Sequence, residues 1–177
     1  ADHPVLRAAS IRRSSITTEW VRAGELTPGD AICLHNHREI TGWGGNYGSA
    51  EGYLAGLLFG DGTLKKDKAQ ISVWPKLKAA NGDPVRDAMM ARAVECAMTL
   101  PHRADFRGFT EVKGRGEYRM SIAALKGICE SLGMAPGKKT ITPELEKCSS
   151  DFYRGFLRGL FDTDGSVQGS LTKGVSV

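Results

Sequence analysis

Two segments about a hundred residues apart repeat the same pattern, and this repeat constrains the fold more than any other feature of the sequence. Residues 52–64 read GYLAGLLFGDGTL, and residues 155–167 read GFLRGLFDTDGSV. Six of the thirteen positions are identical at an offset of 103, and four more are conservative exchanges. A repeat of this length at a single offset indicates a duplicated structural unit.

Between the two copies, hydrophobic periodicity and turn residues predict alternating helices and strands. We expect helices over 49–60, 83–100 and 123–132, an extended segment over 63–74, and a hairpin over 106–121 that turns at 113–116. The fold class is therefore α+β, a helix–strands–helix–hairpin–helix unit over 51–148. A second unit begins at 149–177, and we expect it to be cut short because only about a dozen residues follow its motif.

The first forty residues differ in character from the rest. Short extended stretches are expected at 4–7, 19–22 and 31–35, joined by turns, which predicts a small all-β piece over 1–40 without a core of its own. Glycine-rich residues follow, and we interpret 41–50 as a linker.

Glycines recur every four residues within each copy of the repeat. Gly52, Gly56 and Gly60 lie along one face of the first helix, and Gly155 and Gly159 lie along one face of the second, with Thr163 in the third place. Because a glycine inside a helix costs about 1 kcal/mol relative to alanine, a compensating gain is expected. We predict that the two helices pack closely about a pseudo-two-fold axis within a monomer.

Each of these helices ends at an aspartate followed by glycine. Asp61 and Asp164 occupy equivalent positions, where the helix dipole disfavours an anion. If the helices pack face to face, the two carboxylates also repel each other. A bound Mg²⁺ would offset both effects, so we predict that Asp61 and Asp164 are its ligands. Asp162 aligns with Phe59 and lacks a symmetric counterpart, so it is not predicted to bind metal.

The composition fits a globular protein and excludes some classes. Hydrophobic residues make up 41% of the chain, yet no apolar run is long enough to span a membrane, and no secretory signal is present. The four cysteines form no CxxC pair, which argues against a zinc site or disulfide framework and favours the cytoplasm. The surplus of four basic charges falls within 51–177, consistent with a polyanionic partner.

The repeated segments resemble a known family. Residues 54–62, LAGLLFGDG, and residues 157–165, LRGLFDTDG, look like the two motifs of double-motif (DOD-type) LAGLIDADG homing endonucleases. The resemblance covers 51–177 and implies a site-specific, Mg²⁺-dependent endonuclease acting on double-stranded DNA, with Asp61 and Asp164 as catalytic metal ligands. It also implies a catalytic lysine before the second motif. Lys139 is the match, in a Lys-x-Ile-Pro-like stretch that has one additional residue, and Lys138 is the adjacent alternative.

In this family, twisted sheets read DNA in the major groove. The resemblance therefore makes the basic residues of the predicted strands candidates for phosphate and base contacts. They are Lys65, Lys66, Lys68, Lys76, Lys113, Arg115 and Arg119.

The N-terminal residues are similar to a splicing domain of the Hint type, found in inteins. Residues 1–7, ADHPVLR, resemble the end of a Thr-x-x-His segment, and residues 19–30 resemble the strand and turn that follow it. The resemblance implies that His3 assists the first acyl shift and that a host protein flanks the intein. The pattern is similar to that of inteins carried in ribonucleotide reductases. We expect the fragment by itself neither to splice nor to cleave DNA.

Two other readings stay open. An RNA maturase shares the two-motif fold, but residues 1–40 would then be unexplained. A catalytically decayed DNA-binding relative would not need both Asp61 and Asp164, and both are present.

Overall fold

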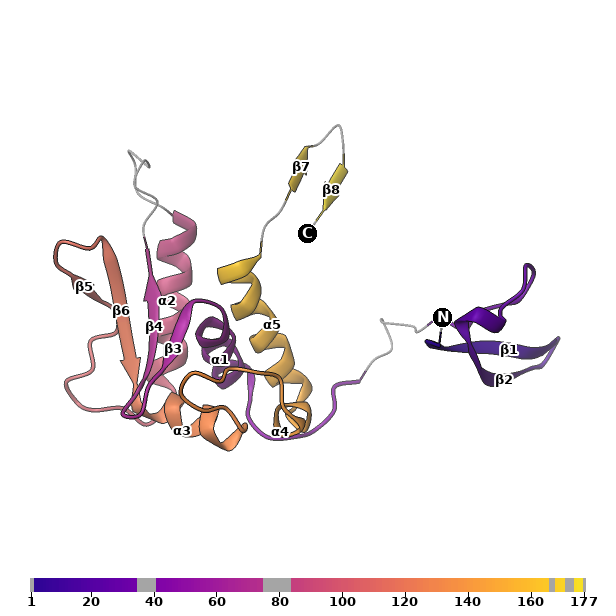
Figure 1. Cartoon of the computed structure of the whole chain (residues 1–177), viewed down its shortest axis with the longest axis horizontal. Helices are drawn as coiled ribbons and strands as arrows, with labels where there is room; N and C mark the ends of the chain where they lie inside the picture. Colours follow the sequence, from indigo (N-terminus) through magenta and orange to yellow (C-terminus); the bar gives the residue numbers. More distant parts are fainter. Residues whose placement is uncertain (1, 35–40, 75–83, 166–167, 171–173, 177) are drawn as a thin grey trace. The chain divides into compact units, whose positions relative to one another are not determined.

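The chain divides into two compact units, Ala1–Thr41 and Gly42–Val177. The computed structural model describes residues 2–34, 41–74, 84–165, 168–170 and 174–176 (Figure 1). Each unit is built from different elements. Within its described residues the first contains strands and a short 3-10 helix, whereas the second combines helices with a sheet.

The N-terminal unit is a long hairpin. Strand β1 (Pro4–Arg12) pairs antiparallel with β2 (Ser15–Arg22), the 3-10 helix η1 (Ala23–Glu25) follows, and Ile32 bridges back to Arg7. The expected strands at 4–7 and 19–22 are therefore too short, because pairing continues to a turn at Arg13 and Ser14.

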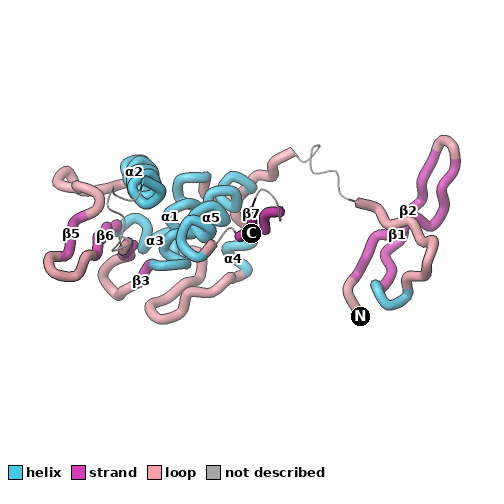
Figure 2. Tube along the Cα trace, turned by 90° about the horizontal axis from the view of Figure 1, so that it is seen from above, coloured by secondary structure: helices cyan, strands magenta, loops and turns pink. Residues whose placement is uncertain are grey.

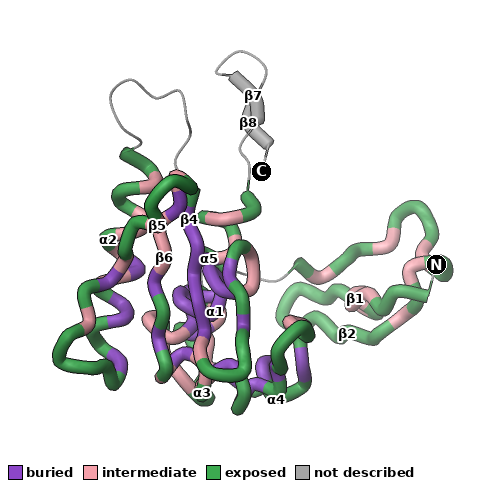
Figure 3. The backbone as a smooth tube through the Cα atoms, turned by 60° about the vertical axis from the view of Figure 1, so that its left-hand side comes forward, coloured by how far each residue is buried: buried purple, intermediate pink, exposed green. Residues whose placement is uncertain are grey.

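This unit has no hydrophobic core within its described residues, and Figure 3 shows it without buried segments. One face of the hairpin presents Leu6 opposite Trp20 and Ile11 opposite Ile16. Trp20 is 70% exposed. The expectation that this piece is too short for a core of its own stays a prediction.

The second unit begins with helix α1 (Ser49–Asp61) and continues through strands β3 (Gly62–Leu64) and β4 (Ala69–Val73) into helix α2 (Pro84–Met98). Strands β5 (Thr110–Val112) and β6 (Glu117–Ile122) form the predicted hairpin, and helix α3 (Ala123–Ser131) follows it. The remaining elements are α4 (Pro143–Glu146), α5 (Ser150–Asp164), β7 (Gln168–Ser170) and β8 (Gly174–Ser176). The predicted mixture of helices and strands is confirmed.

The main sheet has the antiparallel order β3-β4-β6-β5 and two chemically different faces. Ala69, Ile71 and Val73 of β4 are buried on one face, where α1 and α3 contact the strand. Gln70 and Ser72 alternate with them and pair with Ser121 and Arg119 of β6, so the opposite face is polar. The apolar face holds the core of the unit, and Gln70 and Ser72 on the opposite face are also largely covered, at 7% and 6% exposed.

Helices α1 and α5 pack against each other along the rows of glycine, side by side in both Figure 1 and Figure 2. A Cβ atom added to Gly56 would overlap the Phe156 carbonyl oxygen and lie 2.9 Å from the Leu160 nitrogen. A Cβ on Gly159 would overlap the Tyr53 carbonyl and lie 2.9 Å from the Leu57 nitrogen. The predicted close approach of the two helices is confirmed.

These contacts are reciprocal under the offset of the repeat. Gly52 faces the Phe152 carbonyl, and its counterpart Gly155 faces the carbonyl of Ser49, which is the counterpart of Phe152. The contacts of Gly56 and Gly159 exchange partners in the same way. Each helix therefore contacts the other through the same set of positions, as a local two-fold axis between them requires.

Residues 43–48 differ from the linker that the sequence predicts. The Trp43 Nε1 donates to the Cys148 carbonyl at 3.0 Å, and the backbone nitrogen of Ser149 donates to the Asn46 carbonyl at 3.0 Å. The Ser149 hydroxyl, which also caps α5, donates to the Tyr47 carbonyl. This segment therefore belongs to the second unit, where it joins the starts of α1 and α5.

In the described part of the chain, no helix combines the length and apolar character that crossing a membrane requires.

Replacing Gly56 with alanine is expected to force the two helix backbones apart, because the obstructing atoms belong to the backbone of α5. We expect Gly56→Ala to lower the free energy of unfolding by about 3 kcal/mol. Thermal and urea denaturation followed by circular dichroism would measure this loss.

Gly127→Ala on α3 is the matched control, since nothing lies within 4 Å of its added Cβ. It should raise stability by about 0.5–1 kcal/mol. Equal effects of the two substitutions would show that the helices do not depend on close contact.

Candidate functional site

The candidate site lies where α1 and α5 end together. Each helix stops at a glycine whose nitrogen closes the last turn, with Gly62 bonding to the Leu58 carbonyl and Gly165 to the Phe161 carbonyl. The ends meet closely, because a Cβ added to Gly60 would lie 3.3 Å from the Oδ2 atom of Asp164. Asp61, the residue after Gly60, therefore shares this end of the helix pair with Asp164.

Electrostatics show that the two carboxylates interact. Partial burial raises the pKa of Asp61 above its usual range, and the Asp164 carboxylate raises it further. The positive charge of Lys139 acts in the opposite direction. Two mutually repelling carboxylates beside a single cation form a site that would be stabilised by additional positive charge.

Lys139 caps the end of α1. Its Nζ atom donates to the carbonyl oxygens of Phe59 at 2.9 Å and Gly62 at 2.7 Å, and more weakly to those of Leu58 at 3.0 Å and Gly60 at 3.3 Å. An ammonium has only three protons, so these four carbonyls fully occupy it. The neighbouring Lys138 is exposed. Of the two lysines considered from the sequence, Lys139 is the one placed beside the carboxylates.

The residues present fit a hard divalent cation. Asp61 and Asp164 supply carboxylate oxygens, the donors that Mg²⁺ prefers, and Mg²⁺ characteristically retains several waters. No group of three or more candidate ligands occurs among the described His, Cys, Asp and Glu residues. The two aspartates could supply protein ligands to a shared ion only if water and substrate oxygens completed its coordination.

Asp162 has a different partner. It accepts a hydrogen bond of 2.6 Å from the Tyr53 hydroxyl across the helix interface. At the repeat-related position, Phe59 meets Phe156 edge to face, with ring centroids 5.6 Å apart. The same pair of positions thus carries a polar contact on one side of the local axis and an apolar contact on the other.

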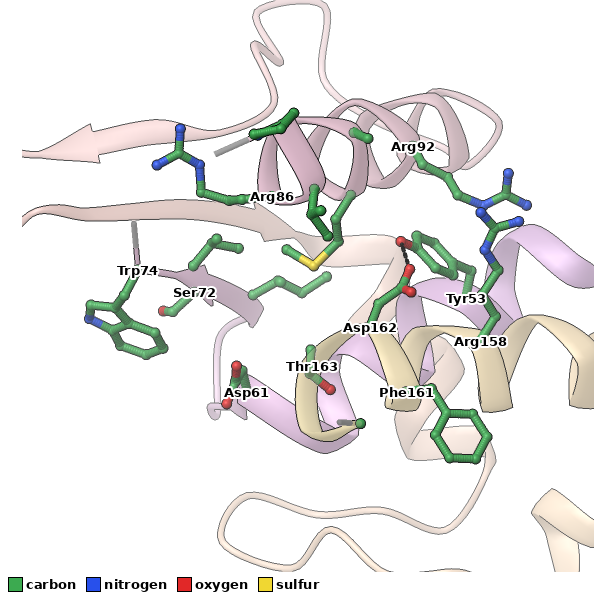
Figure 4. A pocket seen from close by; sticks show the side chains of 17 residues that line it. Tyr53, Asp61, Ser72, Trp74, Arg86, Arg92, Arg158, Phe161, Asp162 and Thr163 are labelled. Atoms are coloured by element: carbon green, nitrogen blue, oxygen red, sulfur yellow. Dashed lines mark hydrogen bonds between the residues drawn. The ribbon is translucent and has the colours of Figure 1, made fainter. Parts of the chain in front are cut away.

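A cavity of about 860 Å³ opens beside this site, and Figure 4 shows Asp61 at its border. Its lining includes Trp74 from the end of β4 and three arginines, Arg86, Arg92 and Arg158. Sequence reasoning did not identify these arginines. Only Arg158 carried a signal, because it replaces the apolar Ala55 of the first copy.

The predicted DNA contacts fall into two groups at opposite ends of the sheet. Lys65, Lys66 and Lys68 lie in the turn between β3 and β4, and Lys113 and Arg115 lie in the turn between β5 and β6. The five residues of β4 separate the two turns by about 17 Å. Basic residues therefore border the polar face at both ends.

Two other predicted contacts stand apart. Arg119 projects from β6, but Glu117 binds its guanidinium through two hydrogen bonds of 2.6 and 2.8 Å. This ion pair occupies part of the donor set expected to contact DNA. Lys76 lies outside the described residues.

His3 precedes β1 in the N-terminal unit. Its side chain is exposed, and its carbonyl oxygen accepts a hydrogen bond of 2.8 Å from the nitrogen of Ala23. Its predicted splicing role remains a prediction.

Comparison with known protein families finds a match over the second copy of the repeat. Residues 151–177 match the model of a LAGLIDADG-like domain. The match includes α5 and Asp164, and it supports a relation to LAGLIDADG endonucleases, with a homing-endonuclease or maturase type of function. No curated protein matches the chain.

Replacing Lys139 with methionine is expected to leave the carbonyls at the end of α1 without their donor. We expect Lys139→Met to lower the free energy of unfolding by about 1–3 kcal/mol, whereas Lys138→Met should leave it unchanged because Lys138 is exposed. Urea denaturation of both variants tests this assignment, and equal stability of the two would contradict it.

Proposed function

We propose that residues 42–177 belong to a LAGLIDADG homing endonuclease that cuts both strands of a specific DNA site by Mg²⁺-dependent hydrolysis. The observation that carries this proposal is the meeting of Asp61 and Asp164 at the adjoining ends of two closely packed helices. The LAGLIDADG-like match over 151–177 adds independent support. The full enzyme would contain two related units, of which α5 begins the second.

Each residue of the site has a defined task in this proposal. Asp61 and Asp164 hold the divalent ion, which when bound activates water and stabilises the leaving oxygen of the phosphodiester. Gly56 and Gly159 bring the two carboxylates together by allowing the helix backbones to touch. Lys139 positions the end of α1 and offsets the negative charge that gathers there.

DNA binding is proposed for the polar face of the main sheet. Lys65 and Lys66 at one end, and Lys113 and Arg115 at the other, would contact phosphates. Ser121 is exposed, lies between them and would face the base edges, whereas its strand partner Gln70 is buried. Basic positions on either side of a polar centre suit a protein that uses phosphates for position and bases for specificity.

We also propose that residues 1–41 form part of an intein splicing domain that carries the endonuclease. The unit is separate, built of strands, and without buried hydrophobic side chains among its described residues, so it needs another polypeptide segment to complete a core. This unit favours an intein over an RNA maturase, which would leave it unexplained. The host protein, for which the resemblance suggests a ribonucleotide reductase, stays a prediction from sequence.

Divalent-ion binding tests the site directly. We expect Asp61→Asn and Asp164→Asn each to weaken Mn²⁺ binding by more than about tenfold, since even residues that only support a metal ligand contribute this much. Titration calorimetry, or paramagnetic broadening of nearby amide signals, would measure the loss. Asp162→Asn is the matched control and should bind normally, because the amide oxygen of the new side chain can still accept the Tyr53 hydrogen bond.

We expect DNA cleavage by the proposed two-unit enzyme to respond to the same three substitutions as metal binding does. Selection from a library of randomised duplexes in Mg²⁺ should yield cut sites with the unaltered protein and with Asp162→Asn, and none with either ligand variant. The ligand variants should still bind the selected duplexes. Full cleavage by both Asp61→Asn and Asp164→Asn would refute the catalytic assignment.

The intein proposal makes a prediction about the source gene. Sequencing outward from the codons for residues 1 and 177 should reveal an upstream Cys or Ser that begins a splicing domain. It should also reveal a downstream His-Asn before Cys, Ser or Thr. A start codon directly before the first codon, or a stop codon directly after the last, would contradict splicing without affecting the endonuclease proposal.

A further inference from the structure

The cavity beside Asp61 also contains two arginines that have no role in the site described so far. Arg92 comes from α2 and Arg158 from α5, and both line the cavity of about 860 Å³ (Figure 4). The sequence places them 66 positions apart, and only the fold brings them to one wall.

The side chain of Arg92 is held in place, but its buried Nε–H group lacks a hydrogen-bond acceptor among the described residues. Its guanidinium lies over the Tyr53 ring at 5.2 Å, and the Tyr53 hydroxyl is fixed by its bond to Asp162. The Nε atom of Arg92 is buried and has no hydrogen-bond partner among the described residues. A buried donor without an acceptor is unfavourable, and native structures usually supply one from water or a ligand.

Arg158 brings a second positive charge to the same place. It is exposed, and no hydrogen bond or ion pair joins it to the described part of the chain. The charges of Arg92 and Arg158 act together on the Tyr53 hydroxyl and on the Cys96 thiol. Figure 4 shows the two side chains extending toward the same end of the cavity.

Nearby carboxylates do not neutralise the pair by contact. Asp162 lines the cavity and is bonded to Tyr53, whereas Glu51 and Glu95 act at longer range on Cys96. None of the three forms an ion pair with either arginine in the described residues. The wall therefore carries N–H donors of Arg92 and Arg158 that bond to no acceptor among the described residues, although the Asp162 carboxylate also lines it.

We propose that Arg92 and Arg158 form a binding site for a phosphate group. Guanidinium groups present planar, forked donors that match phosphate oxygens, and the partly buried setting strengthens such bonds. Because Asp61 lines the same cavity, a phosphate of the DNA strand is one source, and this choice rests on the proposed endonuclease function. A free phosphate compound is the other source.

Inorganic phosphate tests the site without DNA. In the full chain, titration should shift the Nε–Hε signals of Arg92 and Arg158 in ¹⁵N NMR spectra, and Arg158→Gln should weaken this binding by at least about tenfold. Arg158 is exposed, so its substitution should preserve the fold, and Arg92→Gln provides a second variant. Arg154→Gln is the matched control, because Arg154 lies one turn away on α5 and pairs with Asp151.

The salt dependence of duplex binding distinguishes the two sources. If the site holds a DNA phosphate, Arg158→Gln should reduce the slope of log K for duplex binding against log salt concentration by about 1. Arg154→Gln should change this slope less. A lost phosphate shift with an unchanged slope supports a free phosphate ligand. If the unaltered chain does not bind duplex DNA, the endonuclease proposal fails while the phosphate titration still decides the site. No phosphate shift, or an equal loss in Arg154→Gln, overturns the proposal.

Discussion

The structure depends on direct backbone contact between α1 and α5. Gly52, Gly56, Gly155 and Gly159 remove the side chains that would otherwise separate the helices, and each faces a carbonyl of the opposite helix. This contact fixes the distance and register between the two helix ends. The separation of Asp61 and Asp164 is therefore set by glycines one to three turns away, and the chemistry of the site cannot be altered independently of the packing.

The helix pair is symmetric in its backbone contacts but not in its surroundings. Leu54 and Leu58 of α1 are fully buried, whereas their counterparts Leu157 and Phe161 of α5 are 47% and 56% exposed. Figure 3 shows the same contrast, with burial concentrated around α1 and the adjoining sheet. The difference arises because α1 lies against β4 and α3, while α5 has α1 as its main neighbour. The two helices thus share the packing motif but differ on their outer faces, where Ala55 of α1 corresponds to Arg158 of α5.

Local pattern and the repeat predicted most of the second unit. The helices around Gly56, Ala93 and Gly159 and the hairpin at 113–116 follow from periodicity and turn residues, which act over a few positions. Close helix contact was also predictable, because two aligned glycine rows would otherwise destabilise both helices. The equivalent positions of Asp61 and Asp164 in the same repeat also predicted that the two carboxylates lie at the same end of the helix pair.

Features that depend on contacts between distant residues could not be predicted. The cap formed by Lys139 needs the chain before α4 to fold back on α1, and no local signal encodes that path. Arg92 and Tyr53 meet only because α2 lies against α1. The predicted strands of the N-terminal hairpin are too short because Ser10, Thr17 and Thr18 interrupt the apolar alternation. Backbone pairing nevertheless continues through a bulge at Ala9. The sequence predicts a linker at 43–48 because a glycine-rich pattern gives no sign of the hydrogen bonds that its backbone makes.

The cap also explains how an acidic site can exist at this position. The carbonyls at the end of a helix create negative potential, which opposes a carboxylate placed among them. Lys139 offsets this negative potential because it donates hydrogen bonds to the carbonyls of Phe59 and Gly62. Its charge therefore lies beside both Asp61 and Asp164. The lysine therefore lowers the electrostatic cost of placing the two acids at the same end of the helix pair. Since its protons are occupied by backbone carbonyls, Lys139 acts on Asp61 through the position of the helix end and through its own charge. A lysine that resemblance marks as catalytic can thus have a structural task, which is to hold the helix end that carries Asp61.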